Sequence, residues 1–189
     1  MSQPYSRSQS DPLTLVPFSE ELLDSVTKAA QGNPRKRSII RLHEHWEHFH
    51  RMLNSIEPGS YTRPHRHLQP AKPEAFVALR GRVLVVRFDD SGTPVEGTVV
   101  SADGPVRGVE VPAGAWHCLV SLRSGTVIFE TIEGPYDANT HKEFASWAPP
   151  EEDAEAGTAF IASLRMHFES IFPEVAAIDQ IDAEEYDIC

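Results

Sequence analysis

Short apolar runs recur from about residue 38 to residue 133, each separated from the next by glycine, proline or aspartate. The runs either alternate hydrophobic and polar positions or cluster β-branched residues, which is typical of strands with one or both faces buried. The runs are RSIIRLH, HRMLNSI, SYTRPHRH, EAFVALRG, RVLVVRFDD, VEGTVVS, GVEVP, HCLVSL and GTVIFETI. No helical pattern interrupts them, and the turn residues inside RFDDSGTPVE predict a hairpin. The pattern therefore predicts a mainly β fold, an antiparallel barrel or double-sheet jelly roll over about residues 38–135.

Helical periodicity flanks this region on both sides. Ser19 before EELLDSVTKAAQ is a good N-cap, and the apolar positions that follow predict a helix over residues 19–31. Near the C-terminus, apolar positions at three- and four-residue spacing predict a second helix over residues 157–172, which Pro173 ends. Its apolar stripe predicts packing on the outer face of the barrel or across a dimer interface. We divide the chain into a disordered N-terminus (1–18), the β domain with its N-terminal helix (19–152) and an acidic helical C-terminal extension (153–189).

Almost all of the net charge of −11 lies at the C-terminal end of the chain. Residues 1–150 hold 17 acidic and 16 basic residues, whereas residues 151–189 hold 11 acidic residues and a single basic one, Arg165. Neither part offers the basic stripe that nucleic acids require, which argues against nucleic acid as a partner. No apolar run reaches the roughly 18 residues of a membrane span, and the N-terminus lacks the apolar core of a signal peptide. Together with only two cysteines, these features predict a cytoplasmic protein that does not bind membranes.

The strongest chemical pattern joins two short motifs. His65 and His67 are two residues apart on a predicted strand, so their side chains project to the same side, and Glu74 follows after a proline-containing loop. A tight turn at residues 112–116 (PAGAW) leads into His117 on a later strand. Three imidazoles and one carboxylate form a good ligand set for a divalent transition metal such as Zn, Mn, Fe, Ni or Co. This set leaves one or two coordination positions open, and it predicts a metal centre at His65, His67, Glu74 and His117.

Other side chains near these motifs are candidates for substrate binding. Tyr61 and Arg63 share the parity of the two histidines, so we expect them to face the same space, where Arg63 could bind an anionic group. Trp116 could stack on a sugar ring or cap the barrel mouth as a packed side chain. The segment HEHWEHFH (residues 43–50) permits a second metal site, but a solvent-facing, histidine-rich strand pair is the favoured interpretation.

The combined pattern resembles the two sequence motifs of the cupin superfamily. They stand here as GSYTRPHRHLQPAKPEAFVALRG (residues 59–81) and PAGAWH (residues 112–117). The spacer of six residues between His67 and Glu74 is longer than in most members, whereas the spacing from Glu74 to Gly81 is regular. The resemblance implies the cupin barrel and its divalent metal ion.

A narrower resemblance, to the WbuC-type family of cupin-fold metalloproteins, covers roughly residues 19–152. It is carried by NPRKRSIIRLH, RMLNSIEPGSYTRPHRH, LRGRVLVVRFDDSG, VEVPAGAWHCLVSLRSGTVIFETIEGPYD and KEFASWAPPE. Members are often encoded near bacterial surface-polysaccharide genes. The resemblance therefore implies a sugar-related role, although only by association.

Three functions fit these features. The first is a metal-dependent enzyme of the cupin type, an isomerase, epimerase or oxygenase, acting on a small polar molecule such as a sugar or sugar nucleotide. The second is a non-catalytic module that binds or senses a saccharide with the help of the metal. The third is a scaffold with a structural metal, whose acidic extension engages a partner. An open coordination position beside a deep pocket would favour the enzyme, and the exposed edges of the predicted sheets favour a homodimer.

Overall fold

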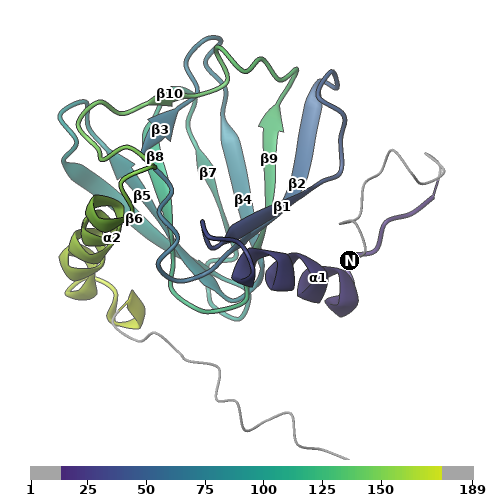
Figure 1. Cartoon of the computed structure of the whole chain (residues 1–189), viewed down its shortest axis with the longest axis horizontal. Helices are drawn as coiled ribbons and strands as arrows, with labels where there is room; N and C mark the ends of the chain where they lie inside the picture. Colours follow the sequence, from purple (N-terminus) through teal and green to yellow (C-terminus); the bar gives the residue numbers. More distant parts are fainter. Residues whose placement is uncertain (1–13, 176–189) are drawn as a thin grey trace, which may run out of the picture.

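The computed structural model of the protein describes residues 14–175. In this part of the chain two antiparallel five-stranded sheets face each other, and one helix precedes and one follows the strands (Figure 1). Sheet A has the strand order β1-β2-β9-β4-β7 and sheet B the order β10-β3-β8-β5-β6. The elements are α1 (Glu20–Gln31), β1 (Arg37–Arg41), β2 (Phe49–Ile56), β3 (His65–Arg66), β4 (Glu74–Arg80), β5 (Arg82–Phe88), β6 (Pro94–Ser101), β7 (Gly108–Val111), β8 (Trp116–Ser121), β9 (Thr126–Glu133), β10 (Glu143–Phe144) and α2 (Ala154–Glu169), followed by a 3₁₀ turn at Pro173–Val175.

The mainly β, double-sheet fold with flanking helices is confirmed. Strands that are far apart in the chain are neighbours in each sheet: β2 pairs with β9 along its whole length, from Phe49 opposite Glu133 to Ile56 opposite Thr126. The hairpin expected in RFDDSGTPVE joins β5 to β6, and the Asp89 carboxylate accepts hydrogen bonds from the backbone N–H groups of Ser91 and Thr93 in its turn. Because side chains alternate between the two faces of each strand, one face of each sheet lines the space between them.

The space between the sheets is apolar at one end and polar at the other. The apolar end is closed by a cluster of buried side chains from both sheets, namely Ile56, Phe76, Ala78, Val83, Val85, Val100, Val111, Leu119 and Ile128. On β4, β8 and β9 the inward positions change to Glu74, His117 and Glu130 toward the other end. The apolar end stabilises the sandwich, and the polar end is available for chemistry.

Helix α1 covers the outer face of sheet A. Ser19 caps its N-terminus by accepting a hydrogen bond from the backbone N–H of Leu22 (3.3 Å), as the sequence predicts. Leu23 and Val26 pack against Leu53 of β2 and Val127 of β9. The apolar stripe of this helix is thus buried on the sheet, which fixes the N-terminal segment to the sandwich.

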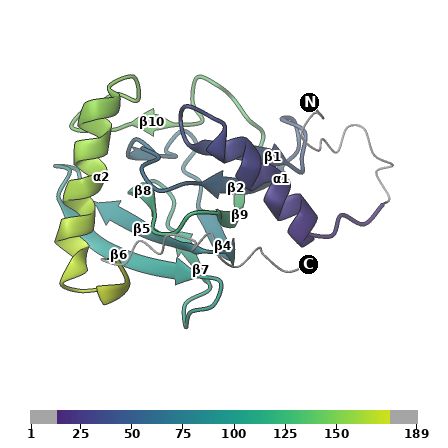
Figure 2. The same ribbon diagram turned by 60° about the horizontal axis from the view of Figure 1, so that its bottom comes forward.

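Helix α2 lies against the outer face of sheet B (Figure 2). Its buried side chains Ile161, Leu164 and Phe168 join a cluster with outward residues of β5 and β8, among them Leu84 and Cys118. Gly97 on β6 makes room for this packing, because a Cβ atom there would stand 2.5 Å from the Phe168 ring. Of the two sites that the sequence left open for the C-terminal helix, the outer face of the barrel is the one observed.

Local structure departs from the sequence prediction in three segments. The short strand β10 (Glu143–Phe144) pairs with β3, although it lies outside the predicted β region of residues 38–135. In SYTRPHRH only His65 and Arg66 belong to a strand, because Pro64 has no N–H to donate to a ladder and the Tyr61 carbonyl accepts from the Arg37 guanidinium (2.6 Å) instead. HEHWEHFH does not form a strand pair: β2 begins only at Phe49. The rings of His43 and His50 stack at 4.0 Å and are buried rather than solvated.

The helices begin and end close to the predicted positions. Helix α2 starts at Ala154, three residues earlier than expected, because Asp153 caps it by accepting from the backbone N–H of Ala156 (3.0 Å). Disorder was expected for residues 1–18, of which residues 1–13 lie outside the described part of the chain. Within the described part, Val16 packs against the cluster beneath α1, and the Phe18 ring lies 5.2 Å from that of Phe129. Residues 176–189, the end of the acidic extension, also lie outside the described part. None of the described helices is long and apolar enough to cross a membrane.

Candidate metal centre

The four side chains singled out by the sequence converge at the polar end of the sandwich. His65 on β3 is directly opposite His117 on β8 in sheet B, and Glu74 begins β4 in sheet A. One ligand atom from each of His65, His67, Glu74 and His117 lies within 4.8 Å of the others, and all four side chains are buried. Among residues 14–175 no other group of three or more potential metal-ligating side chains comes together in this way.

Each imidazole of the cluster is held by its Nδ1 atom. His65 Nδ1 donates to the Arg63 carbonyl (3.0 Å), His117 Nδ1 donates to the Ala115 carbonyl (3.0 Å), and His67 Nδ1 donates to the carbonyl of His141. A carbonyl oxygen can only accept, so each ring carries a proton on Nδ1, and in the neutral ring Nε2 has a lone pair. This is the arrangement in which protein histidines bind metal ions, with a backbone partner fixing the tautomer.

Glu74 lies between two of these lone pairs. Its Oε1 is 2.9 Å from His67 Nε2 and its Oε2 is 2.7 Å from His117 Nε2. His67 Nε2, His117 Nε2 and Glu74 Oε2 are all buried, and none has a hydrogen-bond partner among the described residues. Acceptor atoms this close to one another repel unless a cation binds between them. The residues therefore fit a divalent ion.

The electrostatics of the cluster agree with this donor set. Burial disfavours the charged form of Glu74, but in the absence of an ion His117 and His67, when protonated on Nε2, outweigh it and hold the pKa of that carboxyl well below its usual range. Burial, with the nearby positive charge of Lys142, holds the pKa of His65 well below its ordinary value. At neutral pH the cluster therefore offers an ionised carboxylate and a neutral His65 imidazole, the forms that bind metal.

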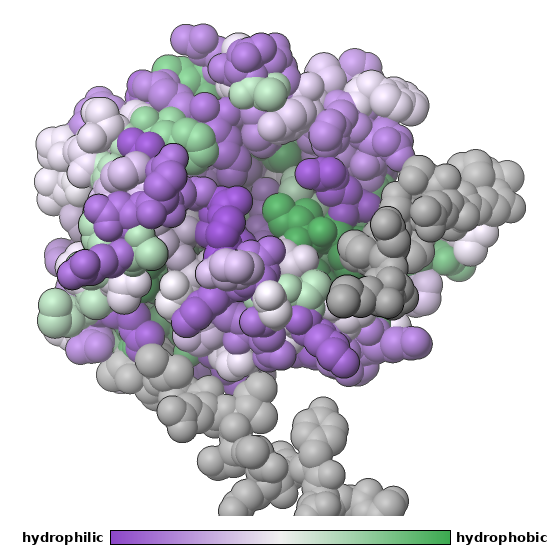
Figure 3. All heavy atoms as spheres, in the orientation of Figure 1, coloured by the Kyte–Doolittle hydropathy of each residue, from purple (hydrophilic) through white to green (hydrophobic). Residues whose placement is uncertain are grey.

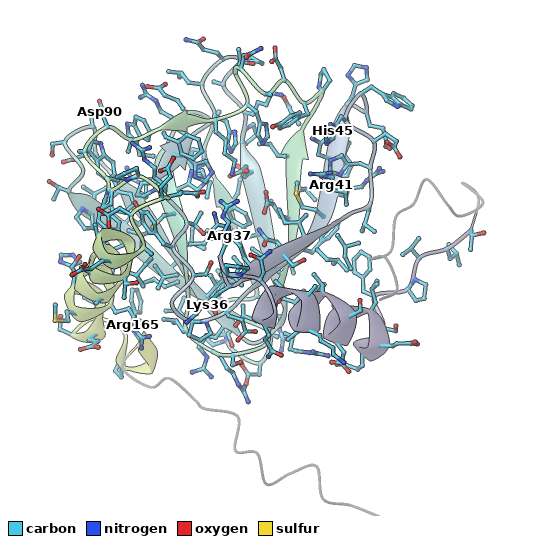
Figure 4. The ribbon with its side chains drawn as sticks, in the orientation of Figure 1. Lys36, Arg37, Arg41, His45, Asp90 and Arg165 are labelled. Carbon is cyan, nitrogen blue, oxygen red and sulfur yellow. The ribbon has the colours of Figure 1, made fainter. Side chains whose placement is uncertain are left out.

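A cavity of about 230 Å³ opens beside the cluster. Its wall includes three of the four candidate ligands, His65, Glu74 and His117. The other lining residues are Arg35, Arg37, Ile39, Asn54, Thr62, Phe76, Leu119, Glu130, Lys142, Phe144 and Glu151. Figure 4 shows Arg37 between the two sheets, and in Figure 3 both hydrophilic and hydrophobic side chains surround this region. An ion held by the cluster would therefore be accessible to a small ligand.

The cavity contains polar side chains that the sequence analysis did not identify. Glu130 on β9 and Asn54 on β2 point inward, and Asn54 Nδ2 donates to Glu130 Oε2 (3.0 Å). Burial and the negative charge of Glu74 raise the pKa of Glu130. The signal that could have revealed Glu130 is its parity: in TVIFETIE it occupies an inward position between Ile128 and Ile132, where an apolar residue is expected.

The three side chains expected to bind substrate have other contacts, and none of them lines this cavity in the described structure. The Tyr61 hydroxyl donates to the Pro149 carbonyl (2.8 Å), and its ring packs beside Phe160 of α2. The parity argument for Tyr61 and Arg63 required a continuous strand, which Pro64 interrupts.

Arg63 and Trp116 are occupied in a similar way. Arg63 donates to the Ala145 carbonyl (2.7 Å). Trp116 lies beneath the Arg66 guanidinium (4.3 Å to the ring centroid) and donates from Nε1 to Asp90 (3.0 Å), in a separate hollow of the surface. The role of all three residues in substrate binding stays a prediction.

Comparisons with known proteins find one family model and several solved structures. The family model described as a domain of unknown function, DUF6016, matches residues 18–100. A search of curated proteins finds no match.

Solved structures resemble the chain at low sequence identity. The capsular polysaccharide assembling protein CapF from Staphylococcus aureus is 20% identical, with a TM-score of 0.48, over 59% of this chain and 32% of CapF. An oxalate oxidase in complex with the substrate analogue glycolate is 16% identical, with a TM-score of 0.44, over 70% of this chain and 76% of the oxidase. KdgF from Halomonas sp. is 17% identical, with a TM-score of 0.40, over 55% of this chain and 80% of KdgF. The chain thus spans about a third of the length of CapF.

The fold and the buried cluster together define the class of protein. The protein is a mainly β sandwich of two antiparallel five-stranded sheets with an N- and a C-terminal helix. Its buried cluster of three histidines and one glutamate is consistent with a transition-metal site. The comparisons do not confirm the WbuC-type resemblance, which stays a prediction.

Proposed function

We propose that this protein is a metal-dependent enzyme of the cupin type that acts on a small polar, hydroxylated substrate. The observation that carries the proposal is the set of buried acceptor atoms on His67, Glu74 and His117, which face one another without hydrogen bonds beside an open cavity. A divalent ion held there would polarise a carbonyl or hydroxyl oxygen of the substrate.

An open site supports catalysis rather than a purely structural metal. Four protein ligands complete a tetrahedral structural site, but they leave positions free on an ion that takes five or six ligands. Because three of the candidate ligands also line the cavity, a substrate could reach those free positions. Glu130 supports the same conclusion, since a buried carboxyl group in the cavity can hold or accept a proton during the reaction.

The size of the cavity bears on the choice of substrate. Its volume of about 230 Å³ is smaller than the roughly 300–1,000 Å³ of pockets for drug-sized ligands. This favours a single sugar or a fragment of similar size over a complete sugar nucleotide, whose nucleotide would extend outside the cavity. A link to surface polysaccharides is part of the proposal only through the WbuC-type resemblance.

Metal analysis of protein purified without added metal tests the proposal. We expect close to one transition-metal ion per chain, and we expect His65→Ala and Glu74→Gln to lose most of it while remaining folded. His43→Ala is the matched control, because His43 is also a buried histidine but lies outside the cluster. Wild-type protein without bound metal, or ligand variants that retain it, would contradict the proposal.

A second measurement separates the enzyme from a saccharide-binding module. Metal-loaded protein that binds a sugar and returns it unchanged, as followed by NMR of the sugar, would identify a binding or sensing role.

The homodimer is also part of the proposal, and light scattering tests it.

A further inference from the structure

The polar groups of the cavity that do not belong to the metal cluster form a second set of contacts. We propose that the cavity binds a small hydroxylated carboxylate, a sugar acid of about six carbons, with its carboxylate against Lys142 and its hydroxyl groups against Glu130 and Asn54. The inference rests on the proposed function, because it takes the four-residue cluster to hold a divalent ion.

The charge of the cavity wall favours an anion once the ion is in place. Three cationic side chains line the cavity (Arg35, Arg37 and Lys142), and so do three anionic ones (Glu74, Glu130 and Glu151). The wall is therefore balanced by itself, and a divalent ion adds an excess of two positive charges. A partly enclosed cavity of low dielectric concentrates that excess, so it attracts negatively charged ligands.

Lys142 is the cation that remains for a ligand. Arg35 and Arg37 both form ion pairs with Glu151, the latter at 2.7 Å. Lys142 has no ion-pair partner among residues 14–175, although its charge acts on both His65 and Glu130. A single ammonium group suits one carboxylate, whereas a phosphate is better held by arginine forks, which here are engaged by Glu151.

Glu130 and Asn54 provide acceptor atoms for hydroxyl groups of a ligand. Both side chains are more than nine-tenths buried, with exposed fractions of 8% and 7%. Asn54 Nδ2 is engaged by Glu130, and Asn54 Oδ1 has no hydrogen-bond partner in the described structure. Two neighbouring acceptors in a cavity are satisfied by O–H groups of a ligand. An ammonium group could also donate to them, but the positive charge of the ion and of Lys142 disfavours it.

The volume of the cavity, about 230 Å³, limits the ligand to about the size of a single sugar. Within that space, one molecule can reach the cluster, Lys142 and the Glu130–Asn54 pair only if it carries hydroxyl groups along a short chain or ring and an anionic group near one end. A six-carbon hydroxy acid meets these requirements.

Isothermal titration calorimetry of the metal-loaded protein tests the inference with four probes. D-gluconate carries hydroxyl groups and a carboxylate, sorbitol only hydroxyl groups, adipate only carboxylates, and glucose 6-phosphate a phosphate. We expect gluconate to bind at least about tenfold more tightly than each of the other three, because each lacks one of the two contacts or presents a phosphate. Equal or tighter binding of sorbitol, adipate or glucose 6-phosphate would overturn the proposal.

Variants assign the two contacts separately. We expect Lys142→Met to weaken gluconate binding by about tenfold or more and to leave sorbitol binding unchanged, whereas Glu130→Gln weakens both. The matched controls are Lys28→Met on α1 and Glu133→Gln, an exposed residue of the same strand as Glu130. Lys142 lies in a partly exposed loop, so we expect Lys142→Met to fold. This variant therefore tests the proposal even if Glu130→Gln does not fold. Unchanged gluconate binding by Lys142→Met would overturn the assignment.

Metal content is measured for every variant in the same experiment. Protein that contains no metal contradicts the proposed function. Protein that contains metal but does not prefer gluconate contradicts only the present inference.

Discussion

Single residues of this protein show how burial changes the chemistry of histidine. The rings of His43 and His50 stack with their centroids 4.0 Å apart, and both side chains are buried. Burial lowers the pKa of His43, and burial together with the adjacent His43 lowers the pKa of His50. The pair is therefore neutral in the folded protein under conditions in which an exposed histidine takes up a proton.

This pair predicts a loss of stability in mild acid. In the unfolded chain a histidine titrates near pH 6.5, so below about pH 6.5 the unfolded state binds protons that the folded state does not. The free energy of unfolding consequently falls as the pH drops from about 7.5 to 5, and thermal denaturation at each pH measures it. We expect His50→Phe, which keeps a stacked ring and removes one titrating group, to make this fall smaller. His48→Phe, at an exposed position, should follow the wild-type curve, and parallel curves for wild type and His50→Phe would contradict the prediction.

At the scale of elements, the two helices stabilise opposite faces of the sandwich through a few large side chains. Phe168 of α2 contacts sheet B at Gly97, where only a glycine leaves space for the ring. On the other side, the apolar stripe of α1 is buried against β1, β2 and β9. Each helix therefore depends on the sheet beneath it, since an isolated helix of this length is only marginally stable in water.

The contact between α2 and sheet B predicts a large effect at one position. Phe168 is 3% exposed, so Phe168→Ala should lower the free energy of unfolding by roughly 3–5 kcal/mol, as measured by urea denaturation. Met166 on the same helix is 67% exposed, and Met166→Ala should change the free energy of unfolding by less than about 0.5 kcal/mol. Equal effects of the two substitutions would show that α2 does not pack as described.

At the scale of the whole molecule, the candidate metal ligands join the two sheets. Glu74 belongs to sheet A, whereas His65 and His117 belong to sheet B. An ion bound by all of them would therefore cross-link the sandwich at its polar end, where the apolar cluster does not reach.

Removal of the metal should consequently destabilise the protein. An ion present at about a hundred times its dissociation constant adds about 2.7 kcal/mol to the free energy of unfolding. We expect a chelator to lower the melting temperature and added metal to restore it. His65→Ala should respond little to either treatment, and an unaltered melting temperature of the wild-type protein would show that no ion links the sheets.

The acidic extension gives a second prediction for the whole molecule. Deletion of residues 153–189 removes α2 and exposes the apolar outer face of sheet B, including Leu84, Val86 and Cys118. We expect the truncated protein to aggregate, because an exposed apolar patch of this kind favours association. Its metal content should be retained, since all four candidate ligands lie at or before His117. Unchanged solubility and melting temperature would mean that α2 is dispensable.

The sequence by itself determined the periodic elements and the ligand set. Alternation of apolar and polar positions or clusters of β-branched residues predicted nine of the ten strands, all but β10, and Ser19 predicted the start of α1. The spacing of His65, His67, Glu74 and His117 identified side chains that the fold brings together. These features are local or are carried by short motifs, so they can be recognised without knowledge of which segments are neighbours.

Only the tertiary structure decided what surrounds the cluster. Glu130, Asn54 and Lys142 come from three separate segments, and their presence in one cavity depends on the pairing of β2 with β9 and on the loop before β10. Tyr61 lies outside this cavity for a related reason. Parity along a strand fixes the face of a side chain only while the strand continues, and Pro64 ends it. Periodicity specifies the face that a residue occupies within its own element, whereas the composition of a cavity depends on long-range contacts between elements, which the packing of the whole chain determines.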